Sequence, residues 1–280
     1  MTKVFLFFGV MLSCLIACGN ENTGAGPDIS MDSAKYYNPA ISYGTLKDSR
    51  DGQVYRTVQI GVQTWMAENL NYDYNVGTAA SYCYNDSKDS CAKYGRLYTW
   101  SAAMDSAAIF SHGGKGCGDG VTCYASGKVQ GVCPAGWHLP DTTEWKALIN
   151  YVDLQTTDDA GYALKATSGW RSRNGVSGDG SDEFGFGALP AGFTYYSEYR
   201  GVRLFKSALD YTAFWTSTEY IYVYETLSKV ETCCAYLPNL HADRTLVGDD
   251  EYDEFGDPRH MDYFARYGKD EADPVRCVKD

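Results

Sequence analysis

The chain has 280 residues and an acidic balance, with 36 Asp and Glu against 24 Lys and Arg, which gives a formal net charge of −12. An acidic surface without a basic stripe is repelled by nucleic acid and by anionic lipid headgroups, so neither is an expected partner. Neutral polymers, cations and other proteins remain as the expected partners.

The first 17 residues have the pattern of a signal peptide. Lys3 supplies a positive charge, and the apolar run from Val4 to Ile16 is too short for an ordinary membrane-spanning helix. The run ends in Leu-Ile-Ala-Cys at residues 15–18, which resembles the lipobox of bacterial lipoproteins. Residues 1–17 are therefore predicted to be a lipoprotein signal peptide.

The lipobox resemblance implies that Cys18 becomes the first mature residue and carries diacylglycerol and an amide-linked acyl chain such as palmitate. Several buried acyl chains give firm membrane anchoring, because each buried methylene contributes about 0.8 kcal/mol. Gly19, which follows the cysteine in place of Asp, favours the outer membrane. The alternative is an ordinary secreted protein that is cleaved after Ala17.

Residues 18–50 are rich in Gly, Asn, Ser and Asp and show little periodicity, which predicts a flexible, lipid-anchored tether. Residues 51–280 are long enough for one large domain or two small ones. Motifs of a single family run through this whole stretch, so we predict one domain over residues 51–280.

Eight cysteines remain when Cys14 and Cys18 are set aside. In an exported chain, disulfides are the default and free thiols the minority, but eight cysteines allow 105 pairings. Zinc is less expected, because the chain has no C-x2-C pair. The eight cysteines are Cys83, Cys91, Cys117, Cys123, Cys133, Cys233, Cys234 and Cys277.

Two early segments have different periods. In residues 54–70 the alternation of Val58, Ile60, Val62 and Thr64 with polar residues predicts paired strands, with the apolar side inward and a type II′ turn at Gly61-Val62. Residues 91–104 are predicted to be a helix that begins near Gly95. Its buried face would be formed by Leu97, Trp100 and Met104.

The strongest helix signal follows Pro140. Asp141 is a good N-cap, and Glu144 completes the pattern of a capping box. The apolar residues Trp145, Leu148, Ile149 and Val152 then recur at helical spacing, which predicts a helix with a buried tryptophan.

The rest of the chain indicates loops and short strands. Glycine-rich residues 168–193 predict loops, residues 248–258 an acidic loop, and residues 219–225 and 274–280 strands. Many short strands with two main helices and long loops predict an α+β fold.

Six stretches together resemble the Fibrobacter succinogenes major paralogous domain, which occurs on exported and lipid-anchored bacterial proteins. No reaction is established for this family. The stretches are IGVQTWMAENLNY (60–72), YGRLYTWSAAM (94–104), GVCPAGWHLPDTTEW (131–145), SDEFGFGALPAG (181–192), FWTSTE (214–219) and VRCVKD (275–280).

A weaker resemblance is to the C-type-lectin-like fold, in which a G-W-x-L-P turn precedes a tryptophan-bearing helix and the final strand carries a bonded cysteine. Residues 136–140, Trp145 and Cys277 occupy these places. The resemblance implies short twisted antiparallel strands and a disulfide between Cys133 and Cys277. Cys83–Cys91 and Cys117–Cys123 are the expected local bonds. For Cys233 and Cys234, a mutual bond, separate partners and a free thiol all stay open.

The many aromatic residues favour a non-catalytic binding module at the cell surface, because tyrosine rings can stack on sugars. By analogy with lectins, the expected ligand is a polysaccharide. The alternative is that these tyrosines are half-buried in the fold. The candidate ligand-binding residues are Tyr195, Tyr196, Tyr199, Tyr220, Tyr222 and Tyr224.

Other functions have less support in the sequence. Asp179, Asp182 and Glu183 share a loop, but neither they nor residues 249–254 match the EF-hand spacing, so solvated acidic loops are favoured and we assign no metal ligand and no cofactor. Whether calcium is bound stays open. No catalytic motif is present, and the four histidines are scattered, so we expect no enzyme. A protein-binding envelope component and, more remotely, a formylglycine-generating-type enzyme are the alternatives.

Overall fold

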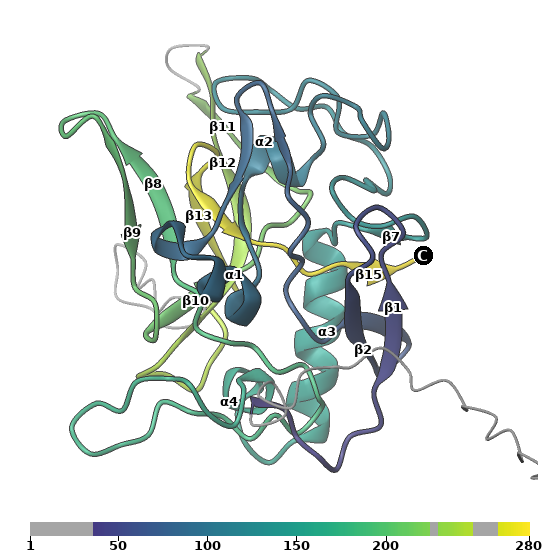
Figure 1. Cartoon of the computed structure of the whole chain (residues 1–280), viewed down its shortest axis with the longest axis vertical. Coiled ribbons are helices and arrows are strands. Elements are labelled where there is room, and N and C mark those ends of the chain that lie inside the picture. The colour runs from purple at the N-terminus through teal and green to yellow at the C-terminus, as the bar shows by residue number, and fades with distance from the viewer. Residues whose placement is uncertain (1–35, 225–228, 249–262) are drawn as a thin grey trace, which may run out of the picture.

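The computed structural model describes residues 36–224, 229–248 and 263–280. Its strands form three antiparallel sheets, and its helices are short apart from α3 (Figure 1). The helices are α1 (Lys88–Tyr94), α2 (Trp100–Ala103), α3 (Thr142–Gln155) and α4 (Ala160–Leu164), with a 3-10 turn at Tyr84–Asp86.

The three sheets are described by their strand order. The five-stranded sheet contains β1 (Gly44–Lys47), β2 (Val54–Ile60), β3 (Gln63–Met66), β15 (Val278–Lys279) and β7 (Trp137–His138). The six-stranded sheet contains β4 (Asn75–Val76), β5 (Ala79–Tyr82), β6 (Leu97–Thr99), β14 (Ala272–Pro274), β8 (Phe193–Ser197) and β9 (Val202–Lys206). In the four-stranded sheet, β12 (Lys229–His241) pairs with β10 (Tyr211–Ala213), β11 (Glu219–Tyr224) and β13 (Phe264–Gly268). The expected α+β class is confirmed at this level.

The predicted hairpin at residues 54–70 is formed by β2 and β3. Ile60 pairs with Gln63, which leaves Gly61 and Val62 as a two-residue loop. Gly61 has a φ of 59°, as a glycine-first turn requires. Val58 and Ile60 are buried as predicted, but Val62 is 98% exposed because it lies at the tip of the turn instead of in a strand.

The prediction of one helix over residues 91–104 is wrong. Helix α1 ends at Tyr94, because Gly95 adopts a φ of 73° and its backbone lies so close to Asn69 that an added Cβ would be 2.7 Å from the Asn69 Cβ. Residues 97–99 then form β6 between β5 and β14, and the short helix α2 follows. Leu97, Trp100 and Met104 are all buried, as predicted, but they belong to a strand, a short helix and its C-cap. Their helical spacing therefore does not reflect a single helix.

Helix α3 confirms the capping-box prediction. The Asp141 carboxylate accepts a hydrogen bond from the Glu144 N–H at 2.8 Å, and the Glu144 carboxylate accepts one from the Asp141 N–H at 3.1 Å. Trp145 is 2% exposed and lies against Trp65, with ring centroids 4.7 Å apart. This tryptophan therefore belongs to the core.

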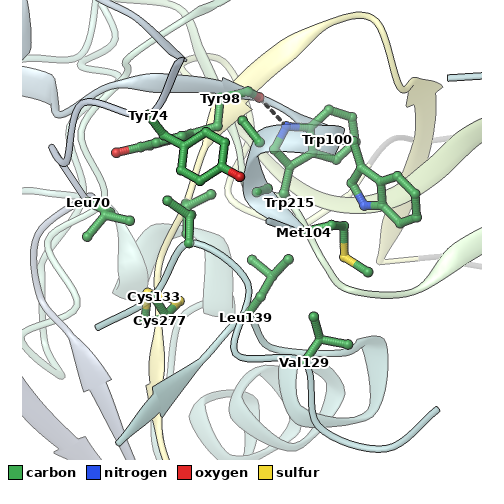
Figure 2. Close-up of a cluster of buried hydrophobic side chains, with 14 of the residues drawn as sticks. Leu70, Tyr74, Tyr98, Trp100, Met104, Val129, Cys133, Leu139, Trp215 and Cys277 are labelled. Carbon is green, nitrogen blue, oxygen red and sulfur yellow. Dashed lines mark hydrogen bonds between the residues drawn. A yellow bond between two sulfur atoms is a disulfide. The ribbon is translucent and has the colours of Figure 1, made fainter. Parts of the chain in front are cut away.

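The main core cluster contains three further buried tryptophans, Trp100, Trp137 and Trp215, the first and last of which are labelled in Figure 2. The indole N–H of Trp215 donates to the Tyr98 carbonyl at 2.6 Å, and that of Trp100 donates to the Thr216 carbonyl at 2.9 Å. Because both indole donors are satisfied, these large rings can be buried without the cost of an unpaired polar group.

The structure contains the three disulfides that were expected and one that was left open. Cys133 bonds Cys277 across a sequence separation of 144 residues, within the main core cluster (Figure 2). The local bonds are Cys83–Cys91 and Cys117–Cys123, and the adjacent residues Cys233 and Cys234 bond each other. Among the open alternatives for this last pair, the structure therefore has the mutual bond.

Residues 36–50, which were predicted as tether, pack against the domain. Asp182 accepts hydrogen bonds from the Asn38 N–H at 2.9 Å and from the Tyr43 hydroxyl at 3.3 Å, and Tyr37 is 8% exposed beneath the Arg56 guanidinium. The folded part therefore includes residues from Tyr36 onward, before the predicted boundary at residue 51.

Loss of the long-range disulfide is expected to destabilise the fold more than loss of a local one. In the chain-entropy model, a loop of 144 residues corresponds to about 5 kcal/mol and a loop of 8 residues to about 2.5 kcal/mol. We expect Cys133→Ala with Cys277→Ala to lower the free energy of unfolding more than Cys83→Ala with Cys91→Ala, as measured by denaturant titration. Equal losses for the two double variants would contradict this ranking.

Candidate functional site

His138 lies where the G-W-x-L-P turn meets the end of the chain. Its Nδ1 is 2.7 Å from Asp280 Oδ1, and its Nε2 is 2.8 Å from Glu144 Oε1, while the histidine itself is 2% exposed. Both ring nitrogens are therefore engaged by carboxylates, and the ring is closed off from solvent. This arrangement ties Asp280 to the start of α3.

The β8–β9 hairpin carries the first group of predicted binding residues. Tyr195 pairs with Leu204 and Tyr196 with Arg203, so the two tyrosines lie on opposite faces of the hairpin. Only the base of the hairpin joins a further strand, where Thr194 pairs with Ala272 of β14. The outer part, including the turn with Tyr199, extends from the body as a two-stranded ribbon (Figure 1).

The three tyrosines of this hairpin have different surroundings. Tyr199 is 97% exposed at the turn, and Tyr196 is 49% exposed on the outer face. Tyr195 is half-buried on the inner face, where its ring stacks on that of Phe193 with centroids 6.2 Å apart. The structure thus leaves Tyr196 and Tyr199 available to a ligand but does not bring all three rings to one face.

The second predicted group lies on β11, away from this hairpin. Tyr220 is half-buried, with its ring centroid 5.5 Å from that of Tyr236 and the Arg266 guanidinium 4.8 Å above it. The side chains of Tyr222 and Tyr224 lie outside the described residues. Tyr220 therefore contributes to packing, and a binding role for all three tyrosines stays a prediction.

Four aromatic rings form an arc on the inner side of the hairpin, which we call the aromatic arc: Tyr195, Phe193, Tyr211 and Tyr267. Successive ring centroids are 6.2, 5.7 and 6.4 Å apart. Because β8 belongs to the six-stranded sheet, and β10 and β13 to the four-stranded sheet, the arc bridges two sheets.

Two carboxylates lie on the same sheet face as half of this arc. Ala272 and Thr194 are paired and share one face, so their neighbours Glu271 and Asp273 share the other face with Phe193 and Tyr195. Asp273 is 1% exposed, and its Oδ2 has no hydrogen-bond partner among the described residues. Sequence analysis missed these residues, because an acidic stretch near the end of the chain is typical of a solvated surface.

Burial determines the protonation of this carboxylate pair. Burial, reinforced by the charge of Asp270, raises the pKa of Glu271 to about 7. Burial and the neighbouring Glu271 raise the pKa of Asp273 well above its ordinary range. Lys206, the partner of Phe193 in β9, shares this face but is exposed and forms no ion pair within the described residues.

Other buried charges have partners of their own. Lys269 forms an ion pair with Glu219 and donates to the Val121 carbonyl at 2.9 Å, which fastens the loop of the Cys117–Cys123 disulfide to the four-stranded sheet. The Lys165 ammonium donates to the His241 and Arg244 carbonyls, and burial lowers its pKa to about 8. These contacts are structural.

A hollow of about 320 Å³ lies at the α4 end of the molecule. It is lined by Thr157, Asp158, Asp159, Tyr162 and Thr245, and it contains none of the predicted binding tyrosines. Two carboxylates line this hollow, those of Asp158 and Asp159. The Asp159 carboxylate already accepts a hydrogen bond from the Thr245 hydroxyl.

The loop carboxylates that were considered for calcium have structural partners. Asp182 is 0% exposed and also accepts from the Gly187 N–H at 2.6 Å, while Asp179 accepts from the Trp170 N–H at 2.9 Å. No group of three His, Cys, Asp or Glu side chains placed to hold a metal ion occurs within the described part of the chain. The acidic residues 249–254 lie outside that part. Nor is any described helix long and apolar enough to cross a bilayer.

Comparison with known protein families matches residues 58–279 to the Fibrobacter succinogenes major domain, Fib_succ_major. The chain belongs to this family. The Fib_succ_major match confirms the predicted family and includes the β8–β9 hairpin, the aromatic arc and both carboxylates. No curated protein and no solved structure matches the chain.

We predict that Glu144→Gln weakens the fold most at neutral pH. Burial raises the pKa of the Glu144 carboxyl, but hydrogen bonds from His138 and from the Asp141 N–H outweigh it and lower the pKa below 4.5. The contribution is therefore complete above pH 4.5 and is lost as the pH falls through the folded-state pKa. Denaturant titration should show a deficit of about 1–2 kcal/mol at pH 7 that shrinks at pH 3. A deficit independent of pH would contradict this.

Glu271→Gln is predicted to change how the free energy of unfolding depends on pH between about pH 5 and pH 8, whereas Glu144→Gln changes it at acidic pH. The pKa of Glu271 is raised from 4.5 to about 7, so the folded chain binds this proton more tightly than the unfolded chain does. Its contribution is present below pH 4.5 and declines as the pH rises toward 7, because the unfolded chain releases its proton first. The wild-type chain should lose more unfolding free energy than the variant between pH 5 and pH 8. Parallel profiles would show that Glu271 is not the titrating group.

Proposed function

We propose that the chain is a lipid-anchored envelope protein whose domain is a non-catalytic binding module for a neutral polysaccharide. The observation that carries this proposal is the pair of exposed rings on the β8–β9 hairpin, where Tyr199 is 97% and Tyr196 is 49% exposed. Tyrosine rings offer an apolar face for stacking on a sugar and a hydroxyl for hydrogen bonding. The net charge of −12 favours neutral over anionic polymers.

The position of the hairpin supports a role in capture. Figure 1 places the β8–β9 turn at the opposite end of the long axis from the first described residues, drawn in purple near α4. The chain leading from Cys18 would join the domain at that purple end. A domain held at this end would present the hairpin turn away from the anchoring membrane, which we propose to be the outer membrane.

We further propose that the domain is C-type-lectin-like. Support comes from the final strand β15, which pairs with both β3 and β7, and from the Cys133–Cys277 bond that fastens it beside the G-W-x-L-P turn. A likeness in fold does not carry a ligand with it, so polysaccharide binding depends on the exposed tyrosines alone.

The non-catalytic part of the proposal is supported by the state of the reactive side chains. His138 is buried between two carboxylates, and Cys233 and Cys234 are bonded to each other, so the structure offers neither thiol of that pair as a nucleophile. A formylglycine-generating-type enzyme would need a reactive cysteine. A protein-binding envelope component is the main alternative to polysaccharide binding.

Retention on insoluble polymers tests the proposed function. The full-length chain in detergent should be retained on cellulose or xylan, and Tyr196→Ala with Tyr199→Ala should weaken retention about tenfold or more, because two stacking rings are lost. Retention is measured by depletion from solution over a series of polymer concentrations.

Tyr124→Ala is the matched control, because Tyr124 is 86% exposed but lies outside the hairpin. This variant should bind like the wild-type chain, and all variants should unfold at the same temperature. Absence of retention on every polymer, together with specific crosslinking of an envelope protein, would overturn the polysaccharide proposal in favour of the protein-binding one.

A further inference from the structure

The carboxylates beside the aromatic arc have no role in the proposed function. The tyrosines proposed to contact polysaccharide lie at the turn and on the outer face of the hairpin, whereas Glu271 and Asp273 lie on its inner face. A buried carboxylate is normally paired with a cation or fully hydrogen-bonded, because the loss of water is otherwise costly. Asp273 Oδ2 has no hydrogen-bond partner and the side chain forms no ion pair within the described residues, so no cation or donor of the described chain stabilises its charged form.

The depth of the two carboxylates forms a gradient from the surface inward. Glu271 is half-buried and immediately follows the turn between β13 and β14, where the chain passes from one sheet to the other. Asp273 follows two residues later on the same face and is 1% exposed.

The aromatic arc provides the second half of a recognition site. Phe193, Tyr195 and Tyr267 are each half-buried, while Tyr211 is 6% exposed, so the arc is half-buried at both ends and deepest at Tyr211. The faces of aromatic rings attract cations through their negative quadrupoles, and this attraction strengthens when the cation loses its water. Aromatic rings beside carboxylates are therefore suited to organic cations, which lose water more readily than small inorganic ions.

We propose that Glu271 and Asp273, together with the aromatic arc, form a binding site for an organic ammonium group. The ammonium would supply the partner that Asp273 Oδ2 lacks, pair with Glu271 at the surface and lie against the rings. Hard metal ions suit this site less, because they require six or more oxygen ligands, and the described residues provide no cluster of three ligating side chains.

The test compares choline with its neutral isostere 3,3-dimethylbutan-1-ol, using the full-length chain in detergent at constant ionic strength. Choline should raise the unfolding temperature saturably and give a binding isotherm by titration calorimetry, because a ligand that binds the folded state stabilises it. The isostere has the same shape without the charge and should do neither. Binding of methylammonium is measured in the same way, to show whether the site prefers a primary or a quaternary ammonium ion.

Variants locate the site. Asp273→Asn and Glu271→Gln should each weaken choline binding tenfold or more, and Tyr195→Leu should weaken it less. Asp158→Asn, an exposed acid of the hollow near α4, is the matched control and should bind like the wild-type chain. Because Asp273 is buried, the unfolding temperature without ligand shows whether its variant is folded.

Several outcomes would overturn the proposal: no saturable binding of either ammonium ion, equal binding of the neutral isostere, or unchanged binding in folded Asp273→Asn. Calcium binding with sub-millimolar affinity in place of choline would also overturn it, since that result identifies an inorganic cation site. The Tyr196→Ala and Tyr199→Ala double variant should bind choline normally, so this proposal and the polysaccharide proposal can fail separately.

Discussion

The whole fold depends on how the last nine residues are held. They enter the six-stranded sheet as β14 and then cross to the five-stranded sheet as β15, so one short segment belongs to two sheets. Between these strands Arg276 is 1% exposed, and its guanidinium donates to the Asn69 side chain at 2.8 Å and to the Phe186 and Gly187 carbonyls. Burial lowers the pKa of this guanidinium to about 10, but its hydrogen bonds and the adjacent Phe186 ring offset the cost. The disulfide at Cys277 then fixes the segment covalently.

The same segment also places Asp273, the buried carboxyl group of the proposed ammonium site. Because β14 pairs with β8, the alternation of its side chains turns Ala272 toward one core cluster and Asp273 toward the aromatic arc. The strand that closes the fold therefore also places a buried carboxylate below the base of the projecting hairpin. These few residues contribute both to the packing of the fold and to the proposed ammonium site. Substitutions here would therefore change both the stability of the fold and ammonium binding.

Local patterns in the sequence predicted the parts of the fold that depend on neighbouring residues. The capping box of α3 and the glycine turn at Gly61 are of this kind, because their hydrogen bonds and backbone angles are set within a few positions. The helix predicted over residues 91–104 was wrong because Gly95 is constrained by Asn69, a contact that spacing along the chain does not reveal. Asp273 was missed for a similar reason: its burial follows from pairing with strands some 80 and 175 residues earlier. Two of the predicted binding tyrosines, Tyr196 and Tyr199, are exposed, but strand alternation, which the prediction did not consider, places Tyr195 and Tyr196 on different faces.

Attachment of residues 36–43 to the domain limits how far the domain could reach from the proposed lipid anchor. Asn38 and Tyr43 are held by Asp182, so only residues 18–35 would connect the proposed lipid site at Cys18 to the folded body. At about 3.3 Å per residue, eighteen residues span about 60 Å when fully stretched, whereas the 33 residues of the predicted tether would have spanned about 110 Å. The domain would therefore sample a shell close to the bilayer, and a polymer would have to approach within that radius to be caught.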